Sequence, residues 1–115
     1  MKVIIAGSRT IADYKMVLDA IEQSRFDITE VVCGMAMGPD LMGRLWAKTH
    51  KPPIPVKEFP ADWKKHGKSA GYIRNAEMGD YADALIAVTN GSLGTKHMIE
   101  YSNKKKLKVF VYSVI

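Results

Sequence analysis

Short apolar runs that stop at turn-forming residues constrain the fold of this 115-residue chain more than any other feature. The runs at residues 2–6, 30–33 and 84–88 each end at a glycine-containing segment, and each segment leads into a stretch with helical patterning. Strands that alternate with helices form parallel sheets, because each helix carries the chain back across the sheet. The three glycine-containing turns are therefore expected at one edge of one sheet.

The whole chain follows this alternation. Apolar patterning predicts strands at residues 2–6, 28–33, 54–59, 84–88 and 108–114, and helices at 12–24, from 39 onward, at 72–81 and at 95–105, with Thr95 as an N-cap. Helical spacing places two sets of side chains on buried helix faces: Tyr14, Val17, Leu18 and Ile21, and Leu41, Met42, Leu45 and Trp46. We predict one domain, residues 1–115, with an α/β Rossmann-like three-layer sandwich and strand order 3-2-1-4-5.

Composition narrows the classes of protein that fit. No apolar run approaches the roughly 20 residues that span a bilayer, so no membrane association is expected, and the single cysteine cannot form an internal disulfide. A cytoplasmic protein is therefore predicted. The histidines are scattered and show no zinc-ligand spacing, so we expect no metal and no cofactor. The formal net charge of +5 favours anionic partners. The alternative interpretation is that the basic side chains are simply exposed to solvent and bind nothing.

Two of the glycine-containing turns carry groups that suit a phosphate. Glycine lets a ligand approach the backbone, hydroxyl groups donate hydrogen bonds, and arginine grips phosphate through two N–H groups. A helix N-terminus adds unpaired backbone N–H groups. The candidate residues are Gly7, Ser8 and Arg9 in the first turn, and Gly91, Ser92, Gly94 and Thr95 in the last. The alternative interpretation is an ordinary strand-to-helix turn capped by serine or threonine.

The middle turn adds three candidate ligand-binding residues, the glycines Gly34 and Gly38 and then Asp40. It is not a P-loop, because no Lys-Ser or Lys-Thr pair follows the last glycine. Asp40 either complements the helix dipole or binds a ribose hydroxyl. Further along, Trp63 either stacks on a base or fills the core, and Arg74 either binds a ligand or forms a salt bridge.

Four segments resemble the YspA or cpYpsA-related SLOG proteins: GSRTIADY, GMAMGPDLMG, FPADWKKHGKSAGYIRNAEM and ADALIAVTNGSLGTKHMI. The resemblance follows the chain in order over nearly its whole length. It implies a compact Rossmann-like domain that binds nucleotides or nucleotide-derived ligands. It also implies a homodimer, for which Trp46 and the methionines of the second helix offer apolar contacts.

The wider superfamily includes the LOG-type phosphoribohydrolases, which cleave the N-glycosidic bond of nucleoside monophosphates. Their pattern contains an arginine-lysine pair and a Pro-Gly-Gly-x-Gly-Thr-x-x-Glu loop. Arg74 matches the arginine, but Asn75 replaces the lysine and Met98 occupies the position of the catalytic glutamate. Glu100 lies roughly 200° further around the helix and cannot simply substitute.

Three functions follow as hypotheses. The first is nucleotide-ligand binding, as a sensor or sequestering module. The second is a nucleotide N-glycosidase in which Arg74 is the catalytic candidate and Asp40 or Glu77 replaces the missing glutamate. The third is binding of single-stranded nucleic acid, because the DNA-processing protein A family builds on a similar fold; few aromatic side chains are present for base stacking.

Overall fold

The computed structural model describes residues 1–114 and contains one five-stranded sheet. All strand pairs are parallel and the order is β3-β2-β1-β4-β5, so the predicted α/β class and strand order are confirmed. The strands are β1 (Lys2–Gly7), β2 (Glu30–Cys33), β3 (Val56–Glu58), β4 (Ala84–Thr89) and β5 (Lys108–Ser113).

The two central strands bring two of the glycine-containing turns to the same level. In the β1–β4 pair, Gly7 lies opposite Val88, so both strands end together. Every residue of β4 is buried, as expected for a strand that is covered on both faces. The edge strand β3 has only three residues, none of them fully buried.

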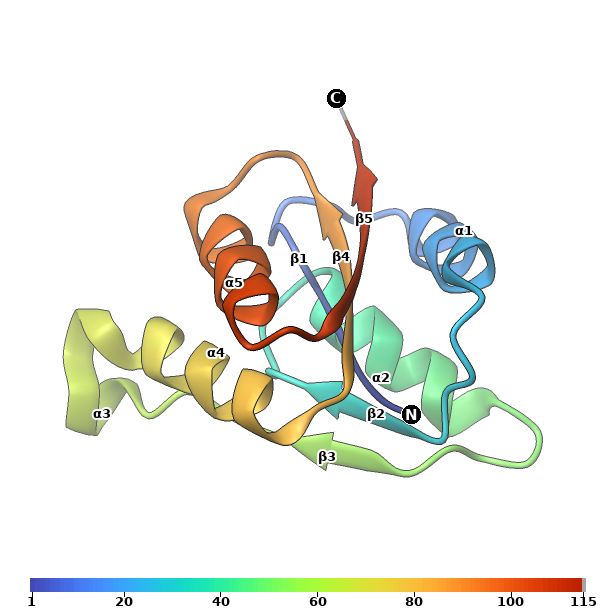
Figure 1. Ribbon diagram of the computed structural model, residues 1–115, viewed down its shortest axis with the longest axis horizontal. Coiled ribbons are helices and arrows are strands. Elements are labelled where there is room, and N and C mark those ends of the chain that lie inside the picture. Colours follow the sequence, from blue (N-terminus) through green and yellow to red (C-terminus); the bar gives the residue numbers. More distant parts are fainter. Residues whose placement is uncertain (115) are drawn as a thin grey trace.

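Helices cover both faces of the sheet and make the predicted three layers (Figure 1). The helices α1 (Tyr14–Ser24) and α2 (Pro39–Thr49) pack on one face, and α4 (Ala70–Tyr81) and α5 (Leu93–Lys104) pack on the other. The core has two parts. One lies between the sheet and the α1–α2 layer, and the other lies between the sheet and the α4–α5 layer.

The helix α2 buries different side chains from those predicted. Gly43 and Ala47 face the sheet, whereas Leu41 and Leu45 are 39% and 51% exposed. A Cβ on Gly43 would lie 2.6 Å from the Ile5 side chain, so the helix sits too close to β1 for a larger residue there. Met42 and Trp46, also expected on the buried face, do pack partly buried against the core.

The predicted boundaries shift at two other helices. Asp13 caps α1 by accepting the Lys15 N–H at 3.0 Å, so the helix begins at Tyr14 rather than at residue 12. Its buried residues are Val17 and Ala20, whereas Leu18, expected on the buried face, is 37% exposed.

The helix α5 begins at Leu93, with Ser92 in the N-cap position, so the prediction of Thr95 as N-cap is wrong. Both residues suit an N-cap. Ser92 occupies it because its backbone is extended and its carbonyl accepts the Lys96 N–H at 3.0 Å, which closes the first helical turn.

The least regular segment of the sequence, residues 60–71, forms two short helices. These are α3 (Trp63–His66) and the 3₁₀ helix η1 (Gly67–Ser69), which runs directly into α4 two residues before its predicted start. Asp62 caps α3 by accepting the Lys65 N–H at 3.0 Å. In Figure 1 this segment stands out at the end of the molecule beside α4.

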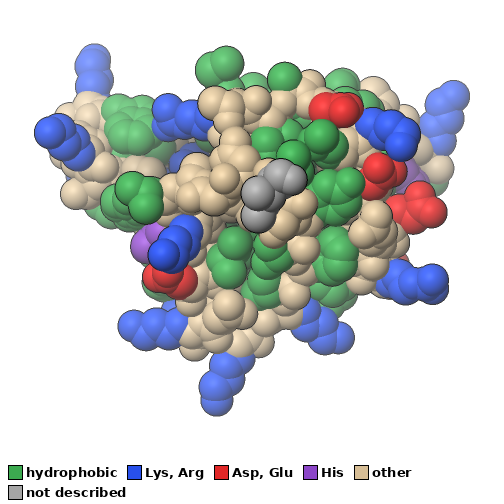
Figure 2. Space-filling view, turned by 90° about the horizontal axis from the view of Figure 1, so that it is seen from above, with side chains coloured by type: hydrophobic (Ala, Val, Ile, Leu, Met, Phe, Trp, Pro, Cys, Tyr) green, Lys and Arg blue, Asp and Glu red, His purple; other side chains and the backbone are tan. Residues whose placement is uncertain are grey.

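The surface charge is dispersed over the face seen in Figure 2. Lys and Arg side chains lie around its outline rather than in a single patch. At the end of α5, Lys105 pairs with Asp80 of α4 at 3.1 Å. Within residues 1–114, no helix is both long and apolar enough to cross a membrane.

Candidate functional site

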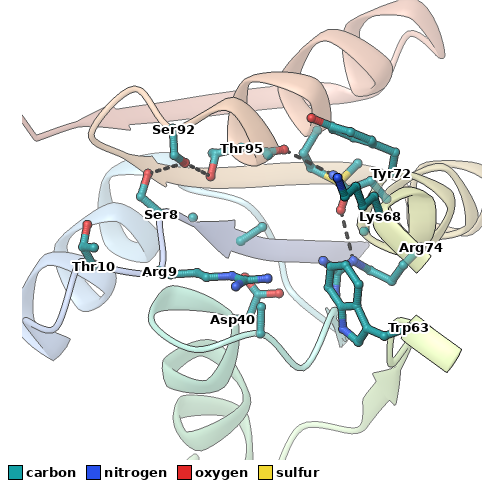
Figure 3. Close-up of a pocket in the computed structure, with 17 residues that line it drawn as sticks. Ser8, Arg9, Thr10, Asp40, Trp63, Lys68, Tyr72, Arg74, Ser92 and Thr95 are labelled. Carbon is teal, nitrogen blue, oxygen red and sulfur yellow. Dashed lines mark hydrogen bonds between the residues drawn. The ribbon is translucent and has the colours of Figure 1, made fainter. Parts of the chain in front are cut away.

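The carboxyl ends of the strands surround a cavity of about 360 Å³ (Figure 3). Residues of all three turns line this cavity. Residues of the segment from α3 to α4 form another part of its wall. The cavity therefore lies where the sequence placed it, at the edge where β1 and β4 end. Of the predicted ligand-binding residues, the following line it: Gly7, Ser8, Arg9, Asp40, Trp63, Arg74, Ser92, Gly94 and Thr95.

Three predicted glycines lie outside the cavity wall. A Cβ on Gly34 would meet the Asp40 carboxylate at 2.6 Å and the Arg74 guanidinium at 2.9 Å, so Gly34 makes room for those side chains. Gly38 is the N-cap of α2 and has φ of 85°. Gly91 has φ of 95°. Gly38 and Gly91 thus have backbone conformations that residues with a side chain rarely adopt.

The first turn has mainly a structural role, because its Ser8 forms hydrogen bonds to β4 and to the last turn. The Ser8 N–H donates to the Val88 carbonyl at 3.0 Å, and the hydroxyl of Ser8 lies 2.8 Å from that of Ser92. The same hydroxyl accepts the Asn90 N–H at 3.1 Å. Ser8 is only 1% exposed, so its polar groups join the first turn to the last rather than projecting freely into the cavity.

The last turn leaves its backbone open. The N–H groups at the start of a helix have no intrahelical partner, which here concerns Leu93, Gly94 and Thr95. The Ser92 side chain makes no capping bond to them and donates instead to the Thr95 hydroxyl at 3.0 Å. A Cβ on Gly94 would meet nothing within 4 Å. The start of α5 is thus an accessible position for an anion.

A buried carboxyl group lies at the start of α2. Asp40 is 4% exposed, and burial raises the pKa of its carboxyl group to about 6. The nearby Arg74 charge and hydrogen bonds from backbone N–H groups, including that of Gly7, lower the pKa and offset part of this effect. Asp40 is therefore a buried carboxyl group in the cavity wall, and the Arg74 charge offsets part of the cost of burying it.

Arg74 is buried in the wall that α4 forms, and its guanidinium lies near the Asp40 carboxyl group beside Gly34. Its guanidinium donates through Nη1 to the Gly34 carbonyl and through Nε to Asn75 Oδ1 at 3.1 Å. Arg74 does not form a surface salt bridge, which was the alternative considered from the sequence. Its contacts instead tie α4 to the end of β2.

Aromatic and basic side chains form the outer wall. Trp63 is 51% exposed and Tyr72 is 46% exposed, and both line the cavity, so Trp63 does not fill the core. The guanidinium carbon of Arg9 lies 5.9 Å from the centre of the Trp63 ring. Lys68 adds a second positive charge to the wall. Figure 3 shows Trp63, Lys68 and Tyr72 on the α3–α4 side of the cavity, with Arg9 reaching toward them from the first turn.

The sequence assigned no binding role to four residues that line the wall: Ala36, Gly71, Tyr72 and Asn75. For the wall residues of α4, the spacing of residues along the helix could have indicated a shared face. Gly71 precedes Arg74 and Asn75 by three and four residues, which places all of them on one side of a helix. No turn motif marks that face, so only helical spacing counted from Arg74 could have identified it.

The carboxyl groups considered for catalysis are not equivalent. Asp40 is the one acidic residue among the described residues of the wall. Glu77 and Glu100 are exposed and do not line the cavity, so Glu77 is not positioned to replace a catalytic acid there. Met98 does line it and is almost fully buried. In residues 1–114, no cluster of His, Cys, Asp or Glu side chains could hold a metal ion.

Comparisons with known proteins identify the family. A family model described as the YspA, cpYpsA-related SLOG family matches residues 1–66, which is more than half of the chain. The chain is also 34% identical over 117 residues to the Gene 61 protein of Mycobacterium phage D29, with 94% of this chain and 93% of the phage protein covered. No solved structure matches significantly. The family-model match and the alignment over most of both chains show that this chain belongs to the YspA, cpYpsA-related SLOG family.

Proposed function

We propose that this chain binds a nucleotide or a nucleotide-derived ligand in the cavity at the carboxyl edge of the sheet. Family membership suggests nucleotide-related binding in general terms. One observation carries the assignment of the site. A single cavity joins an open helix N-terminus, basic side chains and half-exposed aromatic rings. Its volume of about 360 Å³ is that of a small-molecule site.

The proposed pose follows from the chemistry of each wall. The ligand phosphate lies at the start of α5, where the N–H groups of Gly94 and Thr95 and the helix dipole favour an anion. Arg9 and Lys68 add positive charge. Trp63 and Tyr72 offer ring faces to the base, which stacks on aromatic side chains regardless of its identity. The Asp40 carboxylate is positioned to accept a hydrogen bond from a ribose hydroxyl.

Binding without turnover would suit a sensor or a sequestering module. A homodimer belongs to the same proposal and stays a prediction. On α2, Leu41 and Leu45 are exposed apolar side chains, whereas Trp46 packs partly buried against the core and lies beside His50.

Calorimetric titration tests the site. AMP, ADP-ribose, cyclic AMP and adenosine are titrated into the protein, and AMP is expected to bind at least tenfold more tightly than adenosine because only AMP carries a phosphate. Gly94→Leu places a large side chain in the cavity and should lower AMP affinity at least tenfold. Asn103→Leu, at an exposed position of the same helix, is the matched control and should bind as the natural protein does.

Two results would contradict the proposal. One is the absence of binding by any of these ligands at millimolar concentration. The other is unchanged AMP affinity in Gly94→Leu. Binding of a single-stranded oligonucleotide that weakens steeply with salt, with no binding of AMP, would instead favour the nucleic-acid alternative.

A second candidate function is hydrolysis of the N-glycosidic bond, and it rests on Asp40. A buried carboxyl group with its pKa raised to about 6 keeps part of its population protonated near neutral pH and can act as a general acid. Asp40 would donate a proton to the departing base as the C1′–N bond breaks. Water would add to C1′ and give up a proton to the Asp40 carboxylate, so that ribose 5-phosphate and the free base leave and Asp40 is protonated again. Arg74 would hold the phosphate or the ribose in place.

Base release from AMP, followed by chromatography, tests this second function. Activity is expected to fall as the pH rises above about 6, since the acid must be protonated, and to be abolished in Asp40→Asn and Arg74→Ala. Equal base release by the natural protein and by Asp40→Asn would remove Asp40 from the mechanism. No release by any form would leave only binding.

A further inference from the structure

Asn75 uses its whole side-chain amide to connect the two walls of the cavity. Its Oδ1 accepts the Arg74 Nε–H at 3.1 Å. Its Nδ2 lies 3.2 Å from the Gly94 carbonyl and 3.2 Å from His97 Nδ1. Asn75 is 6% exposed, so little of this side chain is open to water. One buried side chain therefore contacts both the guanidinium of α4 and the first turn of α5.

The chemistry of the partners fixes the orientation of the amide. The Arg74 Nε–H can only donate, so the atom that faces it is the amide oxygen. The Gly94 carbonyl can only accept, so the amide nitrogen faces it. The second N–H of the amide then points to His97 Nδ1, which accepts it. Every bond in the group is consistent with this single arrangement.

This network leaves one part of Arg74 available. Its Nε is held by Asn75 and its Nη1 by the Gly34 carbonyl. Its Nη2 lies 3.8 Å from the position that a Cβ on Gly71 would occupy, and Gly71 itself lines the cavity. The hydrogen bonds of Nε and Nη1 thus orient Nη2 toward the part of the cavity beside Gly71.

We propose that Asn75 is a positioning residue that holds Arg74 and the start of α5 in a fixed relation, so that both act on the same anionic ligand. The proposal rests on the function proposed above. Fixing the guanidinium before binding removes the entropy cost of ordering a long side chain when the ligand arrives. Truncating Asn75, whose amide is engaged with Arg74, Gly94 and His97, would free Arg74 and release the Gly94 carbonyl.

A double-mutant cycle on AMP affinity tests this role. Asn75→Ala is expected to lower AMP affinity about tenfold in the natural protein, but less than about threefold once Arg74→Ala is present, because there is no guanidinium left to position. Adenosine affinity should change less than AMP affinity. An equal cost of Asn75→Ala in both backgrounds would overturn the proposal, since a merely structural effect is additive.

A second measurement needs no ligand. In the free protein, the Arg74 Nε–H signal in NMR spectra should exchange slowly with water, and it is assigned by its absence in Arg74→Lys. It should exchange rapidly in Asn75→Ala and stay slow in Asn75→Asp, whose carboxylate still accepts that hydrogen bond. Asn75→Asp also keeps the volume of the side chain if Asn75→Ala fails to fold.

The two measurements separate the two proposals. If AMP does not bind the natural protein but Asn75→Ala exposes the Arg74 Nε–H, the nucleotide assignment fails and the positioning of Arg74 by Asn75 stands. If AMP binds and the Arg74 signal is equally protected in Asn75→Ala, the nucleotide assignment stands and the role of Asn75 is wrong.

Discussion

The first and last turns of the cavity look alike in sequence but differ in how the protein uses them. Each follows a buried central strand, and each contains glycine, serine and threonine. In the first turn, a Cβ on Gly7 would lie 2.1 Å from the Val88 carbonyl oxygen and 2.6 Å from Pro39 Cγ. In the last turn, a Cβ on Gly94 would meet nothing within 4 Å. The first turn is packed and the last is open.

The difference shows that glycine can occur in such a turn for two separate reasons. Gly7 is required because β4 and the start of α2 approach its backbone, and that packing brings the turns together. Gly94 leaves space that the protein itself does not fill. Only the second kind of glycine points to a ligand, and the two kinds are distinguished by tertiary contacts between segments that lie far apart in the sequence.

The largest expected effect is that of Gly7→Ala. The added methyl group collides with backbone and with a proline ring, neither of which can rotate away, so we expect a loss of more than about 3 kcal/mol in the free energy of unfolding. Urea denaturation measures it. Stability equal to that of the natural protein would show that the first turn is not packed as described.

The next effect is a pH dependence that comes from Asp40, whose carboxyl group is buried at the start of α2. Its pKa is raised from 3.8 to about 6, so the folded state binds the proton more tightly than the unfolded state. The sign follows directly: the contribution of Asp40 to stability falls as the pH rises from about 4 to about 6, by roughly 2–3 kcal/mol. The difference in unfolding free energy between the natural protein and Asp40→Asn, measured across this range, isolates it; a constant difference would contradict it.

Ser8→Ala tests the connection between the two turns. Without the hydroxyl group, the Asn90 N–H and the Ser92 hydroxyl lose a partner, so we expect a loss of about 1–2 kcal/mol in the free energy of unfolding. Thr10→Ala is the matched control. Its hydroxyl also bridges the turns, by accepting from Asn90 Nδ2 at 2.7 Å, but it is exposed and should cost less than about 0.5 kcal/mol. Equal losses would show that burial of the Ser8 bond is unimportant.

The smallest change in stability is expected for Gly94→Ala. Alanine favours the helix over glycine, and the methyl group enters open space, so the free energy of unfolding should stay the same or rise by up to about 1 kcal/mol. Thermal denaturation measures it. A loss comparable to that of Gly7→Ala would remove the distinction between the two turns.

The sequence predicted the fold well because strand order depends on local patterning and on general rules of connection. The buried run that forms β4 and the repeated strand-to-helix alternation were sufficient. The same patterning misplaced Leu41 and Leu45, because the approach of α2 to Ile5 depends on Gly43 and is a tertiary property.

The candidate site was predictable only in part. The position of the cavity followed from the parallel sheet, and the exposure of Trp63 was one of two interpretations. The roles of Ser8 and Asn75 depend on hydrogen bonds between residues more than 15 positions apart, with Ser92 and Gly94 as partners. No local pattern encodes those bonds.

One NMR titration tests the central claim most directly, namely that the open start of α5 is where this protein holds an anionic ligand. A second cavity, of about 480 Å³, lies at the opposite edge of the sheet, and Trp46 and His50 line it. On addition of AMP, we predict the largest shifts at the backbone amides of Gly94 and Thr95 and at the Trp63 indole N–H. Shifts centred on the Trp46 indole, or no shifts at the start of α5, would contradict the account.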